Sequence, residues 1–282
     1  MNVVRILAVL AVCAASVSAA GTWPERVLVT NDDGIDDPRL VALARAFAEV
    51  ARVVVVAPLG NCSGSTNYVS AFQRHEVTAE PRDLGPGIEA WGVDGFPGDC
   101  VLLAVTGIMA DAPPDLVVSG VNTGPNLAEA FLASGTIGAA RLAAQLGYPA
   151  VAFSNLDADD ASMMAAVPAW CVRLARSDAA RGLGVAAYLT VNFPDGPAGA
   201  VKGVRWAGLG DQVFHDAFVP AGEDEAGRRV WRHRWWFDDG DAQPAGGDVA
   251  LQRQGWITVS PMRLGDLDGG RLEAGGALPD WR

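Results

Sequence analysis

Two adjacent carboxylates, Asp32 and Asp33, lie in a short turn between an apolar run and a predicted helix. The apolar run covers residues 27–29, and Asp37 followed by Pro38 predicts the helix start. The two acids therefore follow a strand, at the edge where α/β proteins place their chemistry. Neighbouring carboxylates repel each other unless a positive charge lies between them, and their oxygens suit hard cations such as Mg²⁺ or Mn²⁺. An ordinary solvated turn is the alternative, because Asp and Gly both favour turns.

Two further polar loops also follow predicted strands. Residues 57–67 follow one strand and contain Ser63, and residues 119–126 follow another and contain Asn122 and Asn126. In a parallel sheet these loops emerge at the same edge as the two acids, so their oxygens can converge on one cation. Convergence of three loops favours a metal site over three independent turns. Because no base neighbours Ser63, we interpret it as a ligand rather than a nucleophile.

A possible anion site follows at the start of a helix. Ser134, Gly135 and Thr136 lead directly into an alanine-rich helical pattern. Hydroxyl groups and free backbone amides at a helix start bind phosphate. An ordinary helix cap is the alternative, since Ser and Thr supply caps in many helices. If the neighbouring loops bind a cation, phosphate binding at this helix start is favoured over an ordinary cap.

Residues 26–193 alternate short β-branched runs with helical patterns. This alternation predicts an α/β fold, Rossmann-like, with a mostly parallel sheet and helices on both faces. The predicted strands are 27–29, 53–56, 88–93, 116–119, 150–154 and 189–193, and the predicted helices are 38–50, 99–109, 136–146 and 161–176. We divide the chain into a signal peptide (1–20), a catalytic core (24–194) and a C-terminal extension (195–282).

The extension has a different composition and carries six of the nine tryptophans. We expect it to be β-rich, with long loops and a strand at 256–260. Trp231, Trp235 and Trp236 alternate with arginines, which would suit stacking on a base, but subunit contact or hydrophobic packing is the favoured interpretation. The acidic run 238–241 lacks the spacing of a calcium-binding loop and is interpreted as a solvated turn.

Composition excludes several function classes. The 282 residues carry a net charge of −12 and no lysine or arginine cluster, which disfavours a nucleic-acid polymer as partner. Motifs for P-loop hydrolysis, dinucleotide binding, serine-esterase chemistry and zinc proteolysis are missing from the sequence. The three histidines, His75, His215 and His233, are isolated in sequence and are interpreted as surface or structural residues.

The first 20 residues have the pattern of a secretory signal peptide: a basic residue, a short apolar core and small residues near Ala19 and Ala20. We therefore expect an exported, periplasmic protein with no membrane association in the mature form. Lipidation at Cys13 is the less favoured alternative. Three cysteines then remain, Cys62, Cys100 and Cys171, so at most one internal disulfide can form.

Seven motifs, in order along residues 26–261, resemble the SurE family of 5'/3'-nucleotidases. They are VLVTNDDG (27–34), VAPLGNCSGS (56–65), GFPGDCV (95–101), VVSGVNTGPN (117–126), SGTIGAA (134–140), VNFP (191–194) and GWITVSP (255–261). The resemblance implies a Rossmann-like domain and metal-dependent hydrolysis of phosphomonoesters, with nucleoside 5'-monophosphates, and 3'-monophosphates as a second class, as the small-molecule substrates. It also implies that the extension forms oligomers, a homo-dimer or homo-tetramer.

Matched by motif, the resemblance places the divalent cation, Mg²⁺ or Mn²⁺, on Asp32, Asp33, Ser63 and Asn122. Asn126 and the helix start at Ser134, Gly135 and Thr136 would lie near the phosphate. Asp32 and Asp33 would be the catalytic residues, and Asp32 is the preferred one for moving a proton.

The chain departs from the family pattern at three positions. Phe96 stands where Thr is usual, Cys62 where Arg is common, and Arg141 where Glu is usual. None is a predicted ligand, so we expect the chemistry to survive. A disulfide between Cys62 and Cys100 is a hypothesis that free thiols would contradict. Two other functions stay open: a broad acid phosphatase or polyphosphatase, and a non-catalytic exported nucleotide-binding protein.

Overall fold

The computed structural model describes residues 23–211, 214–237, 242–264, 276 and 278–280. The predicted signal peptide (1–20), with Cys13, and the acidic run 238–241 lie outside the described residues. Within this part of the chain, no helix combines the length and the apolarity that crossing a membrane requires.

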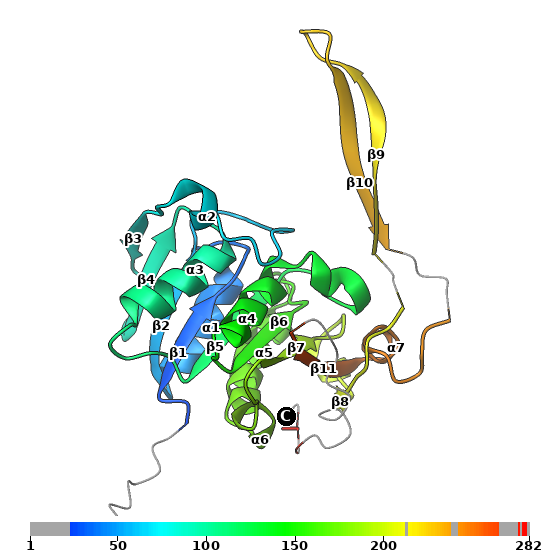
Figure 1. Cartoon of the computed structure of the whole chain (residues 1–282). Helices are drawn as coiled ribbons and strands as arrows, with labels where there is room; N and C mark the ends of the chain where they lie inside the picture. Colours follow the sequence, from blue (N-terminus) through cyan, green and yellow to red (C-terminus); the bar gives the residue numbers. More distant parts are fainter. Residues whose placement is uncertain (1–22, 212–213, 238–241, 265–275, 277, 281–282) are drawn as a thin grey trace, which may run out of the picture.

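A nine-stranded sheet forms the centre of the molecule, in the order β3-β4-β2-β1-β5-β6-β7-β11-β8 (Figure 1). Six neighbouring strands are parallel: β4 (Ile88–Val93), β2 (Arg52–Pro58), β1 (Arg26–Thr30), β5 (Leu116–Asn122), β6 (Ala150–Ser154) and β7 (Ala187–Asn192). The chain leaves β1 in one direction to β2 and β4, then returns to β5 on the other side of β1. The loops after β1 and β5 therefore flank a topological switch point, where α/β sheets bind ligands.

The outer strands are not all parallel to the centre. β3 (Ala79–Arg82) runs antiparallel to β4 at one edge, and β11 (Trp256–Arg263) runs antiparallel to β7. β8 (Gly203–Trp206) closes the other edge, parallel to β11. Two strands of the C-terminal extension thus pair with the same sheet that the core builds.

Helices cover both faces of the sheet and enclose two apolar layers. α1 (Pro38–Ala48), α5 (Ala161–Ala175) and the short α6 (Asp178–Arg181) pack on one face. α3 (Pro97–Leu103), the π-helical turn η1 (Ala104–Ile108) and α4 (Gly135–Gln145) pack on the other. Because side chains alternate along a strand, Val27 and Val29 belong to the first layer and Leu28 to the second. The predicted α/β fold is confirmed.

The sequence misjudged some boundaries. The helix predicted at 99–109 begins at Pro97 and becomes π-helical at Ala104. The short helical turns α2 (Ala71–Arg74), η2 (Ala128–Leu132), η3 (Ala198–Ala200) and α7 (Asp248–Arg253) were not predicted. They span only three to six residues each, too short for a helical period to show.

A long antiparallel hairpin, β9 (Phe214–Glu223) and β10 (Arg229–Phe237), projects away from the sheet (Figure 1). Directly opposed residues share a face of such a ribbon. One face carries most of the aromatic side chains, namely Phe214, Phe218, Trp231, His233, Trp235 and Phe237. Exposed rings include Phe218 at 67% and Trp235 at 60% of their full surface, so this face is solvent-accessible in the single chain.

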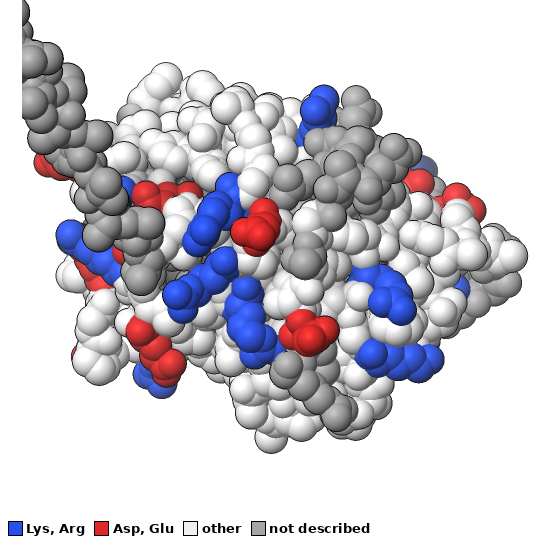
Figure 2. All heavy atoms as spheres, turned by 90° about the horizontal axis from the view of Figure 1, so that it is seen from below, with Lys and Arg blue, Asp and Glu red and all other residues white. Residues whose placement is uncertain are grey.

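Basic and acidic side chains are interspersed on the face that Figure 2 shows. Nucleic-acid polymers bind mainly through continuous basic surfaces. On this face, acidic side chains lie beside the basic ones.

The loop that contains Ser63 is fastened to α4 by a very close approach of two backbones. The Thr66 amide donates a hydrogen bond to the carbonyl oxygen of Ala133 at 3.1 Å. A Cβ atom on Gly138 would lie 1.9 Å from the carbonyl oxygen of Thr66, so only glycine permits this contact. Farther along, the Asp99 carboxylate accepts hydrogen bonds from the amides of Ser70 and Ala71 at 3.1 and 3.0 Å. The segment after Ser63 is thus held at two places.

Replacing Gly138 with alanine should separate the Ser63 loop from α4. We expect the free energy of unfolding to fall by about 1–3 kcal/mol, because the clash outweighs the helix propensity gained, roughly 1 kcal/mol. Chemical denaturation measures this loss. The control is Gly184→Ala, since a Cβ there meets nothing within 4 Å. Equal stability of the two variants would show that the close approach is unimportant.

Candidate active site

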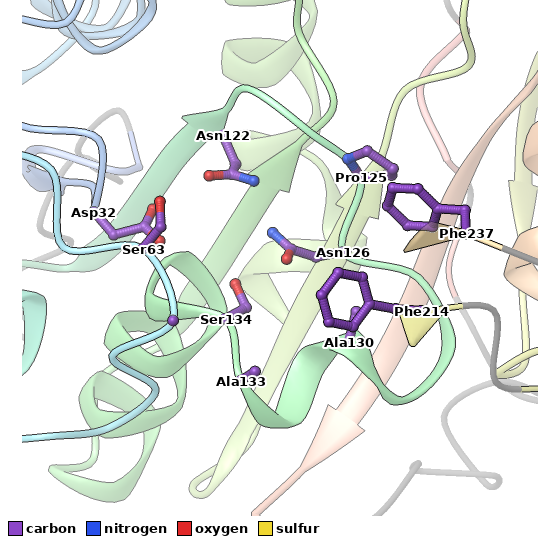
Figure 3. Close-up of a pocket in the computed structure, with 11 residues that line it drawn as sticks. Asp32, Ser63, Asn122, Pro125, Asn126, Ala130, Ala133, Ser134, Phe214 and Phe237 are labelled. Atoms are coloured by element: carbon purple, nitrogen blue, oxygen red, sulfur yellow. The ribbon is translucent and has the colours of Figure 1, made fainter. Parts of the chain in front are cut away.

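Three loops meet at the switch point and surround one pocket (Figure 3). Its lining comprises Asp32, Ser63, Gly64, Asn122, Pro125, Asn126, Ala130, Ala133, Ser134, Phe214 and Phe237. Five of the eight predicted site residues therefore share this pocket: Asp32, Ser63, Asn122, Asn126 and Ser134. Asp33, Gly135 and Thr136 do not line it.

Asp32 is a buried carboxylate held at the start of α4. Only 2% of its surface is exposed, and its Oδ1 accepts a hydrogen bond from the Thr136 hydroxyl. Burial raises the pKa of Asp32, while hydrogen bonds from the Thr136 hydroxyl and the backbone amides of Thr136 and Gly135 oppose that rise. The partial positive charge of a helix start favours a carboxylate there. The carboxylate is thereby fixed in position at the pocket wall.

Gly135 and Thr136 support Asp32 instead of facing the pocket. A Cβ on Gly135 would lie 2.8 Å from Asp32 Oδ2 and 2.7 Å from Ser65 Oγ. Thr136 is fully buried behind the carboxylate. Both residues were predicted to lie near the phosphate, but the carboxylate of Asp32 takes their hydrogen-bond donors. Of this helix start, only Ser134 reaches the pocket.

Asp33 lies beside the guanidinium group of Arg39, but one of its carboxylate oxygens has no partner among the described residues. Its Oδ1 is 3.7 Å from Arg39 Nη2 and accepts a hydrogen bond from the Thr123 hydroxyl at 3.2 Å. Its Oδ2 is buried and has no partner among the described residues. Burial, with the negative charge of Asp32 second, raises the pKa of Asp33 to about 6, although Arg39 opposes the rise. A buried, unpaired carboxylate oxygen is costly unless something positive approaches it.

Arg39 is the supporting residue that sequence reasoning missed. It follows Pro38 in the first turn of α1, is 7% exposed, and its guanidinium binds the Asp37 carboxylate. It also donates to the Thr123 hydroxyl, next to Asn122. Arg39 therefore joins the loop after β1 to the loop after β5. The sequence signal for Arg39 is its place two residues after the acidic helix cap Asp37. Its contact with Thr123, 84 residues away, could not be predicted from that signal.

Ser63 and Asn122 present oxygens to the same pocket. The Ser63 amide donates to Asn61 Oδ1 at 2.9 Å, which fixes the loop while the side chain stays exposed. The Asn122 side-chain amide donates to the Gly124 carbonyl oxygen at 2.9 Å. Figure 3 shows the Asn122 side-chain oxygen on the side that faces Asp32 and Ser63.

Asn126 and Ser134 form the adjoining wall. The Asn126 amide donates to Asn192 Oδ1 at 2.7 Å, and its side chain donates to the Ser154 hydroxyl at 2.8 Å. Ser134 caps α4, with its hydroxyl accepting from the Ile137 amide at 3.1 Å. Asn192 belongs to the VNFP motif, so that motif positions Asn126. These hydrogen bonds fix the orientation of both side chains in the wall.

The donor set fits a hard divalent cation. Asp32, Ser63 and Asn122 line the pocket, and Asp33 is the next residue to Asp32. Carboxylate, hydroxyl and amide oxygens of this kind suit Mg²⁺ or Mn²⁺. Asp33 Oδ2 is buried and has no hydrogen-bond partner among the described residues, and this observation favours a bound cation beside it. Among the described residues, His, Cys, Asp and Glu form no group of three that would suit a metal held by those side chains alone. Ser63 and Asn122 are therefore required to complete such a site.

Cys62, Cys100 and Cys171 are all free thiols in the structure. The Cys62 sulfur lies 3.7 Å from the carbonyl oxygen of Gly95. Burial, followed by the charge of Asp32, raises the pKa of the Cys62 thiol. The hypothesis of a Cys62–Cys100 disulfide receives no support here, and a raised pKa makes the Cys62 thiolate scarce.

Known proteins of similar sequence decide the family. The model of the family described as survival protein SurE matches residues 27–216. The chain belongs to the SurE family. The 5'-nucleotidase SurE 1 of Burkholderia lata is 36% identical over 254 residues, covering 85% of this chain and 91% of that relative. The 5'/3'-nucleotidase SurE of Klebsiella pneumoniae is 34% identical over 242 residues, covering 85% and 90%.

A solved structure of another SurE protein has the same fold. The crystal structure of the SurE protein from Aquifex aeolicus matches with a TM-score of 0.69 and 28% identity, covering 89% of this chain and 98% of that one. The family predicted from seven motifs is confirmed. The roles assigned to single site residues stay predictions.

The raised pKa of Asp33 makes a prediction about pH in the presence of a chelator. Because the folded state holds the proton up to about pH 6, and the ordinary pKa is 3.8, the unfolded state releases it first. Stability should therefore fall as pH rises from about 4 to about 6, and the buried Asp32 should act with the same sign. Replacing Asp33 with asparagine should flatten this fall.

Urea denaturation of the wild type and Asp33→Asn, across pH 4 to 7.5 in chelator, measures the effect. The matched control is Asp36→Asn on the same loop, because Asp36 is exposed and lies 3.6 Å from the partly exposed Arg82. Parallel profiles for wild type and Asp33→Asn would contradict the burial argument.

Proposed function

We propose that this protein is a 5'-nucleotidase: a metal-dependent phosphomonoester hydrolase that releases phosphate from nucleoside 5'-monophosphates, with 3'-monophosphates as a second substrate class. The observation that carries the proposal is the pocket at the switch point, where Asp32, Ser63 and Asn122 face the capped helix start at Ser134. The names of the two bacterial relatives, 5'-nucleotidase and 5'/3'-nucleotidase, support the reaction class.

In this proposal Asp32, Asp33, Ser63 and Asn122 hold the cation, Mg²⁺ or Mn²⁺. When bound, such an ion supplies polarisation of the phosphoryl group and activation of water. Asp32 is the residue for moving a proton, because burial raises its pKa and Thr136 fixes its orientation. Ser134 and Asn126 border the space for the phosphate from the opposite wall.

The predicted signal peptide supports export to the periplasm as part of the proposal. A mature protein that begins near residue 20 in a periplasmic extract would test this location. Retention of residues 1–20 in the cytoplasmic fraction would contradict it.

One substrate panel tests the proposed reaction. Phosphate release is measured from 5' and 3' nucleotides, small phosphomonoesters and polyphosphate, each with Mg²⁺, with Mn²⁺ and with chelator. We expect AMP to be hydrolysed only with a divalent ion. Asp32→Asn should lower that rate about 100-fold or more, because it removes a ligand and a proton carrier.

Asp36→Asn is the matched control, since this acid lies on the same loop and is exposed. It should keep wild-type activity, and circular dichroism should show both variants folded. Full activity of Asp32→Asn would refute the mechanism. Turnover of small esters or polyphosphate in preference to nucleotides would favour a broad phosphatase, and nucleotide binding without turnover would favour a non-catalytic binder.

We also propose that the aromatic face of the hairpin, beyond the pair Phe214 and Phe237 at its base, pairs with a second copy of the chain, in a homo-dimer or homo-tetramer. A two-stranded ribbon is marginal by itself, and exposed aromatic patches of this kind mark interfaces. Light scattering should show an oligomer that Trp231→Ser and Trp235→Ser together weaken. Phe72→Ala is the control, because that ring is 80% exposed but lies outside the hairpin. A monomeric wild type would contradict the proposal.

A further inference from the structure

We propose that Phe214 and Phe237, the two residues at the base of the hairpin, form the subsite that binds the nucleobase. This inference rests on the proposed nucleotidase function and specifies how its substrate is chosen. It also explains how an enzyme with this pocket distinguishes a nucleotide from a smaller phosphate ester.

Both rings lie at the far end of the pocket from the carboxylate. Phe214 begins β9 and Phe237 ends β10, and the two residues are directly opposed in the hairpin register. Figure 3 shows their rings extending toward the pocket from one side, with Asp32 and Ser63 on the other. The ring centroids are 5.7 Å apart at an interplanar angle of 67°. Phe237 keeps 41% of its surface exposed, so its ring is available to a ligand.

The pocket changes character along its length in the same order as a nucleotide does. The end at Asp32, Ser63 and Ser134 is polar, and Figure 3 draws Asn126 and Ala133 between that end and the rings. A nucleoside monophosphate likewise runs from phosphate through ribose to a flat aromatic base. The rings therefore lie where the base of a phosphate-anchored nucleotide would extend, and every base offers a face for stacking.

A third ring holds the two phenylalanines in place. Trp235 stacks on Phe214, with centroids 6.3 Å apart and planes 25° apart. Trp235 also meets Phe237 edge-on, at 5.8 Å and 79°. Rings fixed in this way lose little freedom when a base binds, which favours affinity.

The test compares a substrate that has a base with one that lacks it. AMP and ribose 5-phosphate share the phosphate and the sugar, so only AMP should depend on the rings. We expect Phe214→Ala and Phe237→Ala each to raise KM for AMP about 5-fold or more, from the usual strength of base stacking, and to leave ribose 5-phosphate unchanged. Phe72→Ala is the control, because that ring is 80% exposed and lies outside both the hairpin and the pocket lining.

Two conservative variants separate stacking from packing. Phe237→Tyr should retain wild-type KM for AMP, whereas Phe237→Leu, which keeps an apolar side chain but no ring, should not. Light scattering of each variant shows whether the oligomeric state has changed. Equal effects on AMP and ribose 5-phosphate, or no effect on either, would overturn the subsite, as would full rescue by leucine.

Calorimetry keeps the inference testable if turnover fails. AMP and ribose 5-phosphate are titrated with Mg²⁺ into wild type and into each Phe→Ala variant. A base-dependent affinity that the variants lose supports the subsite, even if absence of hydrolysis has refuted the nucleotidase. Equal affinity of AMP for wild type and variants, alongside normal hydrolysis, refutes the subsite alone.

Discussion

The burial of the Asp32 carboxylate against the start of α4 is the contact on which the rest of the site depends. An ionised carboxylate out of water is costly unless donors surround it. The Thr136 hydroxyl and the amides of the first turn provide those donors, and the helix start adds favourable charge. Glycine at 135 is needed for this approach, and glycine at 138 brings the Ser63 loop onto the same helix. One carboxylate and one helix thus fix the relative positions of three loops.

The two adjacent acids differ in their hydrogen-bond partners. The Asp32 carboxylate accepts hydrogen bonds from the Thr136 hydroxyl and from amides at the start of α4. Asp33 Oδ1 accepts from the Thr123 hydroxyl and lies near Arg39, whereas its Oδ2 is buried and has no partner among the described residues. An isolated pair of like charges on one turn would repel. Arg39 balances part of this charge at 3.7 Å from Asp33 Oδ1, and the buried Oδ2 has no partner among the described residues. The sequence shows two equivalent aspartates, but the fold makes them different.

Much of the site was readable because it follows from strand order. β-branched runs located the parallel strands, and polar loops at their carboxyl ends had to meet at one edge, so Asp32, Ser63 and Asn122 converge as expected. Thr136 illustrates the limit of such prediction. Its hydroxyl donates to Asp32, 104 residues earlier in the chain, and the local sequence of the helix start does not show that this partner is present. Arg39 and the β8–β11 pairing were hidden for the same reason, since both depend on partners distant in sequence.

The position of the hairpin in the chain has a consequence for loop closure. The excursion of the chain that contains β9 and β10 starts after β8 and returns at β11, and these two strands are neighbours in the sheet. Pairing of β8 with β11 therefore offsets the entropic cost of bringing the two ends of this segment together. That cost grows only slowly with the length of the segment. The hairpin can lengthen, shorten or change sequence at little cost to the sheet. The first and last residues of the hairpin are the two rings at the pocket, Phe214 and Phe237. Such variation would therefore change the ring end of the pocket and leave the Asp32 end intact.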